Sequence, residues 1–230
     1  MVVRNIFWES IDLKGTQKSV QGFSDDLLYD IAQQEKFHVQ IISTDAVPII
    51  SALNNPKVDG VLSAYAPTPN NEKYLNFSHP YFVVGPVLVV RNGAPVSSLD
   101  DMNGKEVAFE RGYPYAIQLS GTSSCFFRPY DKISSALDDL LNKTVDGVIM
   151  DSTIAFQFIQ GFYAGKIHIV GAPLKPTALR LIAIKGENDE LIEMFNKGLK
   201  EFHSNGKLVE LLQYWNLYDA QYPDHQNIFK

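Results

Sequence analysis

The sequence predicts an α/β protein of two similar lobes, each a mostly parallel sheet flanked by helices. Short apolar runs typical of strands alternate with amphipathic helical segments along nearly the whole chain, which favours this class. The chain also contains an internal repeat, because Val58-Asp59-Gly60-Val61 recurs as Val145-Asp146-Gly147-Val148. Each copy follows a short amphipathic segment and opens a buried apolar strand. The repeat therefore predicts equivalent strands in two lobes, whose ends can face each other across a cleft.

The first part of the chain predicts three strands joined by helices. A helix is expected to open after Gly22, with Ser24 or Asp25 as its N-cap, because short polar side chains accept hydrogen bonds from first-turn N–H groups. A shorter helix over residues 47–53 is expected to end at Asn54-Asn55-Pro56, since proline cannot continue a helix. The strands are expected over residues 2–8, 39–43 and 58–65.

The second part of the chain repeats this alternation. An extended apolar run over 81–90 and a polar break at 91–95 precede it, and a capped helical turn over 98–105 opens it. The pattern predicts further strands over 106–109, 145–151, 167–170 and 179–184, with helices from 116 and over 134–141, 152–163, 191–204 and 208–215.

Composition argues against several functional classes. The formal net charge is −6 and no run of lysine or arginine occurs, which disfavours nucleic acid and anionic membrane surfaces as partners. The single cysteine, Cys125, allows no internal disulfide and no cysteine-type zinc site, and its apolar neighbours indicate an inert, packed side chain. No glycine-rich phosphate loop or dinucleotide fingerprint is present, so neither a cofactor nor a metal is expected.

The sequence also bears on location. No stretch reaches the roughly 20 apolar residues of a membrane-spanning helix. The amino terminus lacks the positive start and long apolar region of a signal peptide, and a trimmed mature form with an added methionine would begin in this way.

Several short motifs follow one another in a specific order. They are Gly22-Phe23-x-x-Asp26-Leu27, Phe77-Ser78-x-Pro80-Tyr81, Leu99-x-Asp101-Met102-x-Gly104-Lys105, Val145-Asp146-Gly147-Val148-x-x-Asp151 and Asn205-Gly206-x-Leu208. In this order and spacing, over about residues 2–218, the chain resembles the bacterial family 3 extracellular solute-binding proteins, which deliver polar amino acids to ABC importers.

The resemblance implies a periplasmic binding protein type II fold. Lobe 1 is expected to comprise residues 1–88 and 182–230, and lobe 2 residues 89–181. Crossing segments near 86–90 and 179–183 would form a hinge that lets the lobes close on a solute in the cleft. The resemblance also implies a monomer in the periplasm or cell envelope, with a small-molecule ligand and a membrane ABC permease as partners.

Amino-acid capture needs an anion for the α-ammonium, donors for the α-carboxylate and a pocket for the side chain. The resemblance places the ammonium-binding carboxylate at Asp151, which could also cap a helix beginning at Ser152; both roles can hold. The carboxylate side departs from the family, because Asn71 stands where an arginine is usual and Ala66 where a threonine is usual. Asparagine lacks the charge and the bidentate fork of a guanidinium.

Other polar and aromatic residues are expected to complete the binding site. Arg111 is predicted to supply a replacement anion contact, or else to be a solvated loop charge, and Glu9 would join Asp151 in holding a cation. Ligands on such sheets bind beyond the carboxyl ends of strands. The aromatic candidates would line the cleft or pack at a lobe rim. The remaining candidates follow strand ends or lie in the lobe 2 loop: Trp8, Tyr65, Thr68, Tyr113 and Tyr115.

Two other functions stay open. The protein could be an enzyme on the same fold, similar to cyclohexadienyl dehydratases, with Glu9 or Glu110 as a general acid of raised pKa. Its five histidines are scattered and form no clear pair with a carboxylate, which disfavours this hypothesis. It could also be a sensor or scaffold lobe that has kept the fold and lost amino-acid affinity.

Overall fold

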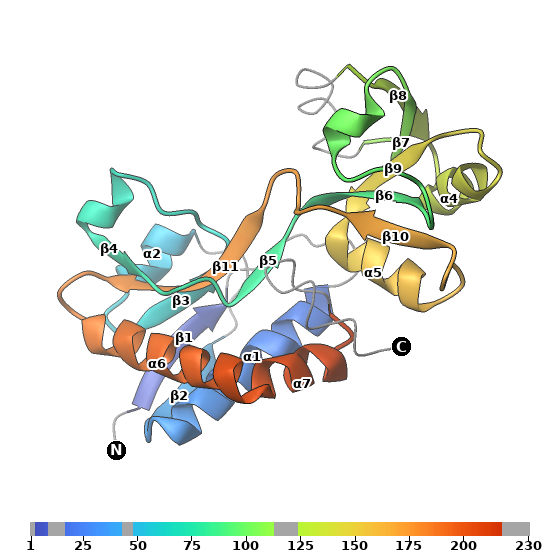
Figure 1. The fold of residues 1–230 in the computed structure, drawn as a ribbon. Coiled ribbons are helices and arrows are strands. Elements are labelled where there is room, and N and C mark those ends of the chain that lie inside the picture. Colours follow the sequence, from blue (N-terminus) through green and yellow to red (C-terminus); the bar gives the residue numbers. More distant parts are fainter. Residues whose placement is uncertain (1–2, 9–16, 43–47, 113–123, 218–230) are drawn as a thin grey trace. The chain divides into compact units, whose positions relative to one another are not determined.

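The chain folds into two compact α/β units, which are connected twice. The structure, a computed structural model, describes residues 3–8, 17–42, 48–112 and 124–217 (Figure 1). Unit 1 comprises Met1–Val83 and Thr177–Lys230, and unit 2 comprises Val84–Pro176. The helix expected from residue 116 lies outside the described residues. Within the described parts, no helix combines the length and apolar character that would let it cross a membrane.

The sheet of unit 1 joins a parallel group of strands to an antiparallel one. Its strands, in spatial order, are β2 (His38–Ile42), β1 (Val3–Trp8), β3 (Gly60–Ser63), β11 (Thr177–Ile184) and β4 (Leu75–Phe77), and β5 (Phe82–Val84) pairs with β11. The first three strands run parallel, whereas β11 runs antiparallel to β3 and to β4. The carboxyl ends of β1 and β3 therefore lie at the same edge of the sheet as the beginning of β11.

Helices cover this sheet through apolar faces. The helices of unit 1 are α1 (Gln17–Gln34), α2 (Ile49–Leu53), α6 (Asp189–Asn205) and α7 (Lys207–Tyr214), with a 3-10 turn, η1, at Asn71–Lys73. Figure 1 shows α1, α6 and α7 side by side. Phe23 of α1 and Phe195 of α6 both contact the ring of Tyr81, which is buried. Ile49 and Leu53 of α2 pack with Val61 and Ile182 of the sheet.

The expected start of α1 is wrong. The helix begins at Gln17, so Ser24 and Asp25 lie in its interior rather than at its amino end. The Ser24 hydroxyl donates to the carbonyl of Val20, one turn earlier, at 2.7 Å, and lies 3.0 Å from the Tyr81 hydroxyl. A serine that bonds back to its own helix satisfies its polar group without capping.

Unit 2 has a second mixed sheet with both faces covered. Its strands, in spatial order, are β10 (Ile167–Val170), β6 (Pro86–Arg91), β9 (Gly147–Asp151), β7 (Glu106–Glu110) and β8 (Phe126–Tyr130). The last three run parallel, and β6 is antiparallel to β9 and β10. Side chains alternate along β6: Val87 and Val89 pack with α4 (Ile133–Leu141) and α5 (Ser152–Gln160), while Leu88 and Val90 pack against η2 (Leu99–Met102).

The aspartates of the two repeated sequences make equivalent hydrogen bonds in their two units. In unit 1 the Asp59 N–H donates to the Asn5 carbonyl at 2.8 Å, and the Asp59 carboxylate accepts the Asn5 N–H at 2.7 Å. In unit 2 Asp146 clasps Glu106 in the same way, at 2.8 and 3.1 Å. Each aspartate thus fixes one residue of a neighbouring parallel strand, the third residue of β1 or the first residue of β7.

The glycine of each repeat allows close packing of the sheet. A Cβ at Gly147 would lie 2.8 Å from Leu88 Cδ1 and 2.9 Å from Met102 Cε. A Cβ at Gly60 would lie 3.1 Å from Leu181 Cδ1. All three distances are shorter than ordinary carbon contacts, so these positions favour glycine for space rather than for backbone conformation.

Candidate functional site

The carboxyl end of β3 presents polar groups at one edge of the unit 1 sheet. β3 ends at Ser63, which is fully buried, and the Ser63 hydroxyl accepts the Tyr65 N–H at 2.9 Å. The chain turns there, and the Tyr65 side chain is 38% exposed. A large aromatic side chain exposed at a strand end is available for contact with a ligand.

The loop after Tyr65 is held together by Asn71. The Asn71 carboxamide accepts the Thr68 N–H at 2.7 Å and donates to the Ala66 carbonyl at 3.0 Å, and its side chain is buried. The Asn71 N–H donates in turn to the Thr68 hydroxyl at 3.3 Å. Because Pro67 and Pro69 have no N–H to donate, this side chain supplies bonds that the backbone cannot. Asn71 therefore orders the loop that carries Ala66 and Thr68.

Arg180 is a functional candidate that the sequence reading did not single out. It lies in β11 directly opposite Ser63 of β3, at the edge where β3 ends. It is partly buried, and this burial lowers the pKa of its guanidinium from the usual value. The sequence feature that could have identified it is an arginine inside the apolar run Leu179 to Ile184, since arginine seldom occurs in a buried strand without a partner.

Four of the predicted site residues lie wholly or partly outside the described residues. Trp8 ends β1, where it pairs with Leu62 of β3, but its side chain lies outside the described residues. Glu9, Tyr113 and Tyr115 also lie outside them.

Asp151 stands at the end of β9 in unit 2 and caps the helix that follows. Its carboxylate oxygen Oδ1 accepts the Thr153 N–H at 3.0 Å and the Thr153 hydroxyl at 2.7 Å. Asp151 is partly exposed, whereas Ser152 and Thr153 are buried. The capping interaction is the structural role that the sequence allowed for, and it fixes the direction of the carboxylate.

Arg111 directly follows β7 in unit 2, the unit that also contains Asp151. The register pairs Phe109 of β7 with Ile149 of β9, and Arg111 and Asp151 follow at the same offset. The Arg111 guanidinium donates from Nε to Asp131 at 2.9 Å, and both side chains are largely exposed. An exposed ion pair of this kind is weakly held, so the Arg111 side chain can exchange partners.

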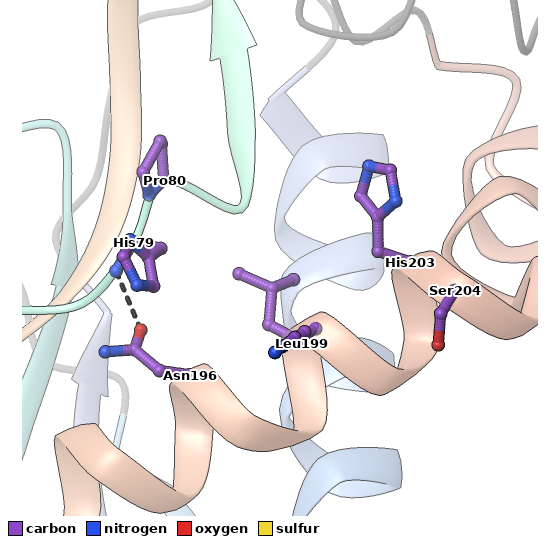
Figure 2. Close-up of a pocket in the computed structure, with 7 residues that line it drawn as sticks. His79, Pro80, Asn196, Leu199, His203 and Ser204 are labelled. Atoms are coloured by element: carbon purple, nitrogen blue, oxygen red, sulfur yellow. Dashed lines mark hydrogen bonds between the residues drawn. The ribbon is translucent and has the colours of Figure 1, made fainter.

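A pocket of about 420 Å³ opens elsewhere on unit 1, against α6 (Figure 2). The His79 N–H donates to the Asn196 side-chain oxygen at 2.7 Å at its rim. No carboxylate lines this pocket, so it offers no counterion for an ammonium group, and none of the predicted site residues takes part. Its lining residues are His79, Pro80, Asn196, Leu199, Lys200, His203 and Ser204.

Neither a metal nor a reactive cysteine site is evident in the described parts of the chain. No group of three or more histidine, cysteine, aspartate or glutamate side chains gathers there in a way that could hold a metal ion. Cys125 is a free, partly buried thiol that packs with the apolar cluster around Leu88 and Met102.

The chain belongs to the bacterial extracellular solute-binding proteins, family 3. The model of that family matches residues 8–218. The predicted fold is confirmed as well: the structure of the L-cystine solute receptor of Neisseria gonorrhoeae, in its unliganded open conformation, superposes with a TM-score of 0.73. That match covers 95% of this chain and 94% of the receptor at 21% sequence identity.

Curated relatives point in the same direction. The arginine-binding extracellular protein ArtP of Bacillus subtilis is 26% identical over 204 residues, which cover 86% of this chain and 78% of ArtP. The ABC transporter arginine-binding protein 1 of Escherichia coli is 23% identical over 207 residues, which cover 87% of this chain and 84% of that protein. Both are named as binding proteins, which fits the expectation of a binding protein rather than an enzyme.

Proposed function

We propose that the protein binds a polar amino acid, or a small amine-containing solute, for uptake by an ABC importer. Family membership supports a solute-binding role, and the relatives named above bind arginine or cystine according to their names. Both of these ligands carry an α-ammonium and an α-carboxylate group. A site for such a solute needs a fixed carboxylate to meet the ammonium group.

The position of Asp151 is the observation that carries the proposal. Its carboxylate is partly exposed at the carboxyl end of a parallel strand, the edge where ligands of α/β sheets bind. The bonds from Thr153 fix its orientation, so little side-chain entropy is lost when an ammonium binds. An ionised carboxylate has about four acceptor sites, so capping α5 and binding an ammonium are compatible.

The solute would be held between the two lobes and enclosed by hinge closure. The chain passes between units at Val83-Val84 and again at Pro176-Thr177, and a double connection suits such a motion. The expected lobe bounds at residues 88 and 182 remain a prediction. A monomer in the periplasm or cell envelope that delivers its solute to a membrane permease completes this proposal.

The remaining site residues stay predictions. Arg111 and Tyr65 are placed so that their side chains are open to solvent at strand ends. Ala66, Thr68 and Asn71 form one ordered loop whose backbone can contact a ligand. Trp8, Glu9, Tyr113 and Tyr115 are retained from the sequence. A dehydratase-like activity has no specific observation in its favour. A sensor role stays an alternative, because the virulence sensor protein BvgS of Bordetella pertussis is 27% identical to this chain over 229 residues, which cover 94% of this chain and 17% of BvgS.

The variant Asp151→Asn tests the proposal. Asparagine can still accept the Thr153 N–H and cap α5, but it removes the negative charge. We expect affinity for the best-binding amino acid to fall by about 10- to 100-fold in calorimetry, because charge-assisted hydrogen bonds contribute about 1.5–3 kcal/mol. The melting temperature of the free protein should stay close to that of the wild type. Unchanged affinity would refute the role of Asp151.

A further inference from the structure

We propose that Arg180 binds the carboxylate of the solute, in place of the arginine that this chain lacks at Asn71. This inference rests on the proposed function and deepens it, since it names the anion-binding residue of unit 1 and requires a ligand that carries a carboxylate.

The register of the sheet places Arg180 at the edge where β3 ends. β11 runs antiparallel to β3, and Arg180 pairs with Ser63, the last residue of β3. Side chains of directly opposed residues lie on the same face, with Cβ atoms about 5 Å apart. The flexible guanidinium therefore starts beside the Ser63 hydroxyl and the turn that carries Tyr65.

Arg180 makes a weaker hydrogen bond than the other arginines of the chain. Its guanidinium Nη1 donates to the Ala178 carbonyl at 3.5 Å, the outer limit of such a bond. Within the described ranges no carboxylate pairs with it. The other arginines are bound to carboxylates or to two carbonyls: Arg4 to Asp59 and Glu190, Arg91 to Leu140 and Val145, Arg111 to Asp131, and Arg128 to Glu106.

A partly buried guanidinium without a counterion favours an anionic ligand. Burial costs Arg180 some of its hydration, which is the cause of its lowered pKa, yet an arginine stays charged at neutral pH. A planar carboxylate can accept two parallel N–H bonds from a guanidinium and restore what was lost. The carboxylate of the solute would thus serve as the counterion of Arg180.

Asn71 cannot provide this charge. Its carboxamide is buried and already accepts from Thr68 and donates to Ala66. The loop that Asn71 orders therefore carries no cation at this position. Arg180 places a cation at the same edge of the sheet from the neighbouring strand β11.

The experiment distinguishes the contribution of the ligand's carboxylate to binding from that of its ammonium group. The protein is denatured, freed of carried ligand and refolded, and the best binder among L-arginine, L-histidine, L-glutamine and L-cystine is identified by calorimetry. That amino acid is then compared with its carboxamide, which keeps the ammonium but has no carboxylate. The wild type should prefer the amino acid strongly over the amide.

We expect Arg180→Gln to weaken binding of the amino acid on the order of 10- to 100-fold and to change binding of the amide less than about threefold. Arg180→Lys keeps the charge without the bidentate fork, so it should give an intermediate preference and also serves if the glutamine variant folds poorly. Arg128→Ala removes an exposed arginine paired with Glu106 and should leave both affinities unchanged.

Three results would overturn the inference. First, the preference for the amino acid over the amide could survive in both Arg180 variants. Second, the amino acid and the amide could lose affinity equally, which would indicate a merely structural role for Arg180. Alternatively, Arg111→Ala could abolish the preference while Arg180→Gln keeps it, which would assign the carboxylate to Arg111. Absence of binding by the wild type itself would refute the proposed function first, and this inference with it.

Discussion

Gly22 in the interior of α1 should tolerate no larger residue, although alanine is the better helix former. A Cβ at Gly22 would lie 2.1, 2.5 and 2.5 Å from three ring carbons of Trp215, far inside the 3.5–4.0 Å of ordinary carbon contacts. The indole cannot simply turn away, because its Nε1–H donates to the Asp26 carboxylate at 2.9 Å. Gly22→Ala must therefore displace the ring, the helix or both.

The sign of the effect follows from two opposing magnitudes. Alanine gains about 0.8–1 kcal/mol over glycine from helix propensity alone. Overpacking costs about 1–3 kcal/mol, and loss of the Trp215 hydrogen bond to a charged acceptor adds about 1.5–3 kcal/mol if the ring moves away. We expect Gly22→Ala to lower the free energy of unfolding by about 1–3 kcal/mol.

A double-mutant cycle gives this expectation a sharp test. In a Trp215→Ala background the obstacle is gone, so Gly22→Ala should raise the free energy of unfolding by about 0.5–1 kcal/mol. Urea unfolding of the wild type, both single variants and the double variant measures the four values. The reasoning fails if Gly22→Ala stabilises the wild type, or if its effect has the same sign in both backgrounds.

Two other residues give predictions for stability. Burial, with the neighbouring Asp26 carboxylate, raises the pKa of Asp25 from 3.8 to about 6, so the folded state disfavours the ionised form of this side chain. The contribution of Asp25 to the free energy of unfolding is therefore lost as the pH rises from about 4 to 6. Asp25→Asn should therefore stabilise the protein at pH 7 by about 1 kcal/mol, a value discounted for solvent screening, with the gain vanishing near pH 4 in urea titrations; a gain that persists at pH 4 would contradict this cause. Asp146→Ala leaves the Glu106 N–H without its acceptor and should destabilise the protein by about 1–2 kcal/mol, while Asp146→Asn keeps an acceptor and should cost less. Equal losses in both variants would show that the hydrogen bond is unimportant.

Much of the fold could be predicted because its signals are local. Apolar strand runs and turn residues placed β10 over residues 167–170, as observed, and most other strands within two or three residues. The repeat around Asp59 and Asp146 was also visible in the sequence. The hydrogen bonds that each aspartate makes to a residue of a neighbouring strand could not be predicted, because Asn5 and Glu106 lie far from Asp59 and Asp146 in sequence.

Other features depend on tertiary contacts that no local pattern reveals. Ser24 resembles an N-cap in sequence, but its hydroxyl is satisfied by Val20 and Tyr81, so α1 starts earlier. Asn71 could be recognised as a departure from the family, but not as the residue that fastens its own loop. The position of Arg180 opposite Ser63 depends on the pairing of β11 with β3, which no local sequence pattern reveals.

The central claim is that the chain binds an amino acid through its ammonium group. Calorimetry of the refolded, ligand-free protein against a panel of polar L-amino acids tests it most directly, with melting temperature as a second readout, because a ligand that binds only the folded state raises it. We predict saturable one-to-one binding of at least one panel member, weakened by Asp151→Asn. Absence of both heat and thermal stabilisation across the panel, in a protein that has refolded, would contradict the claim.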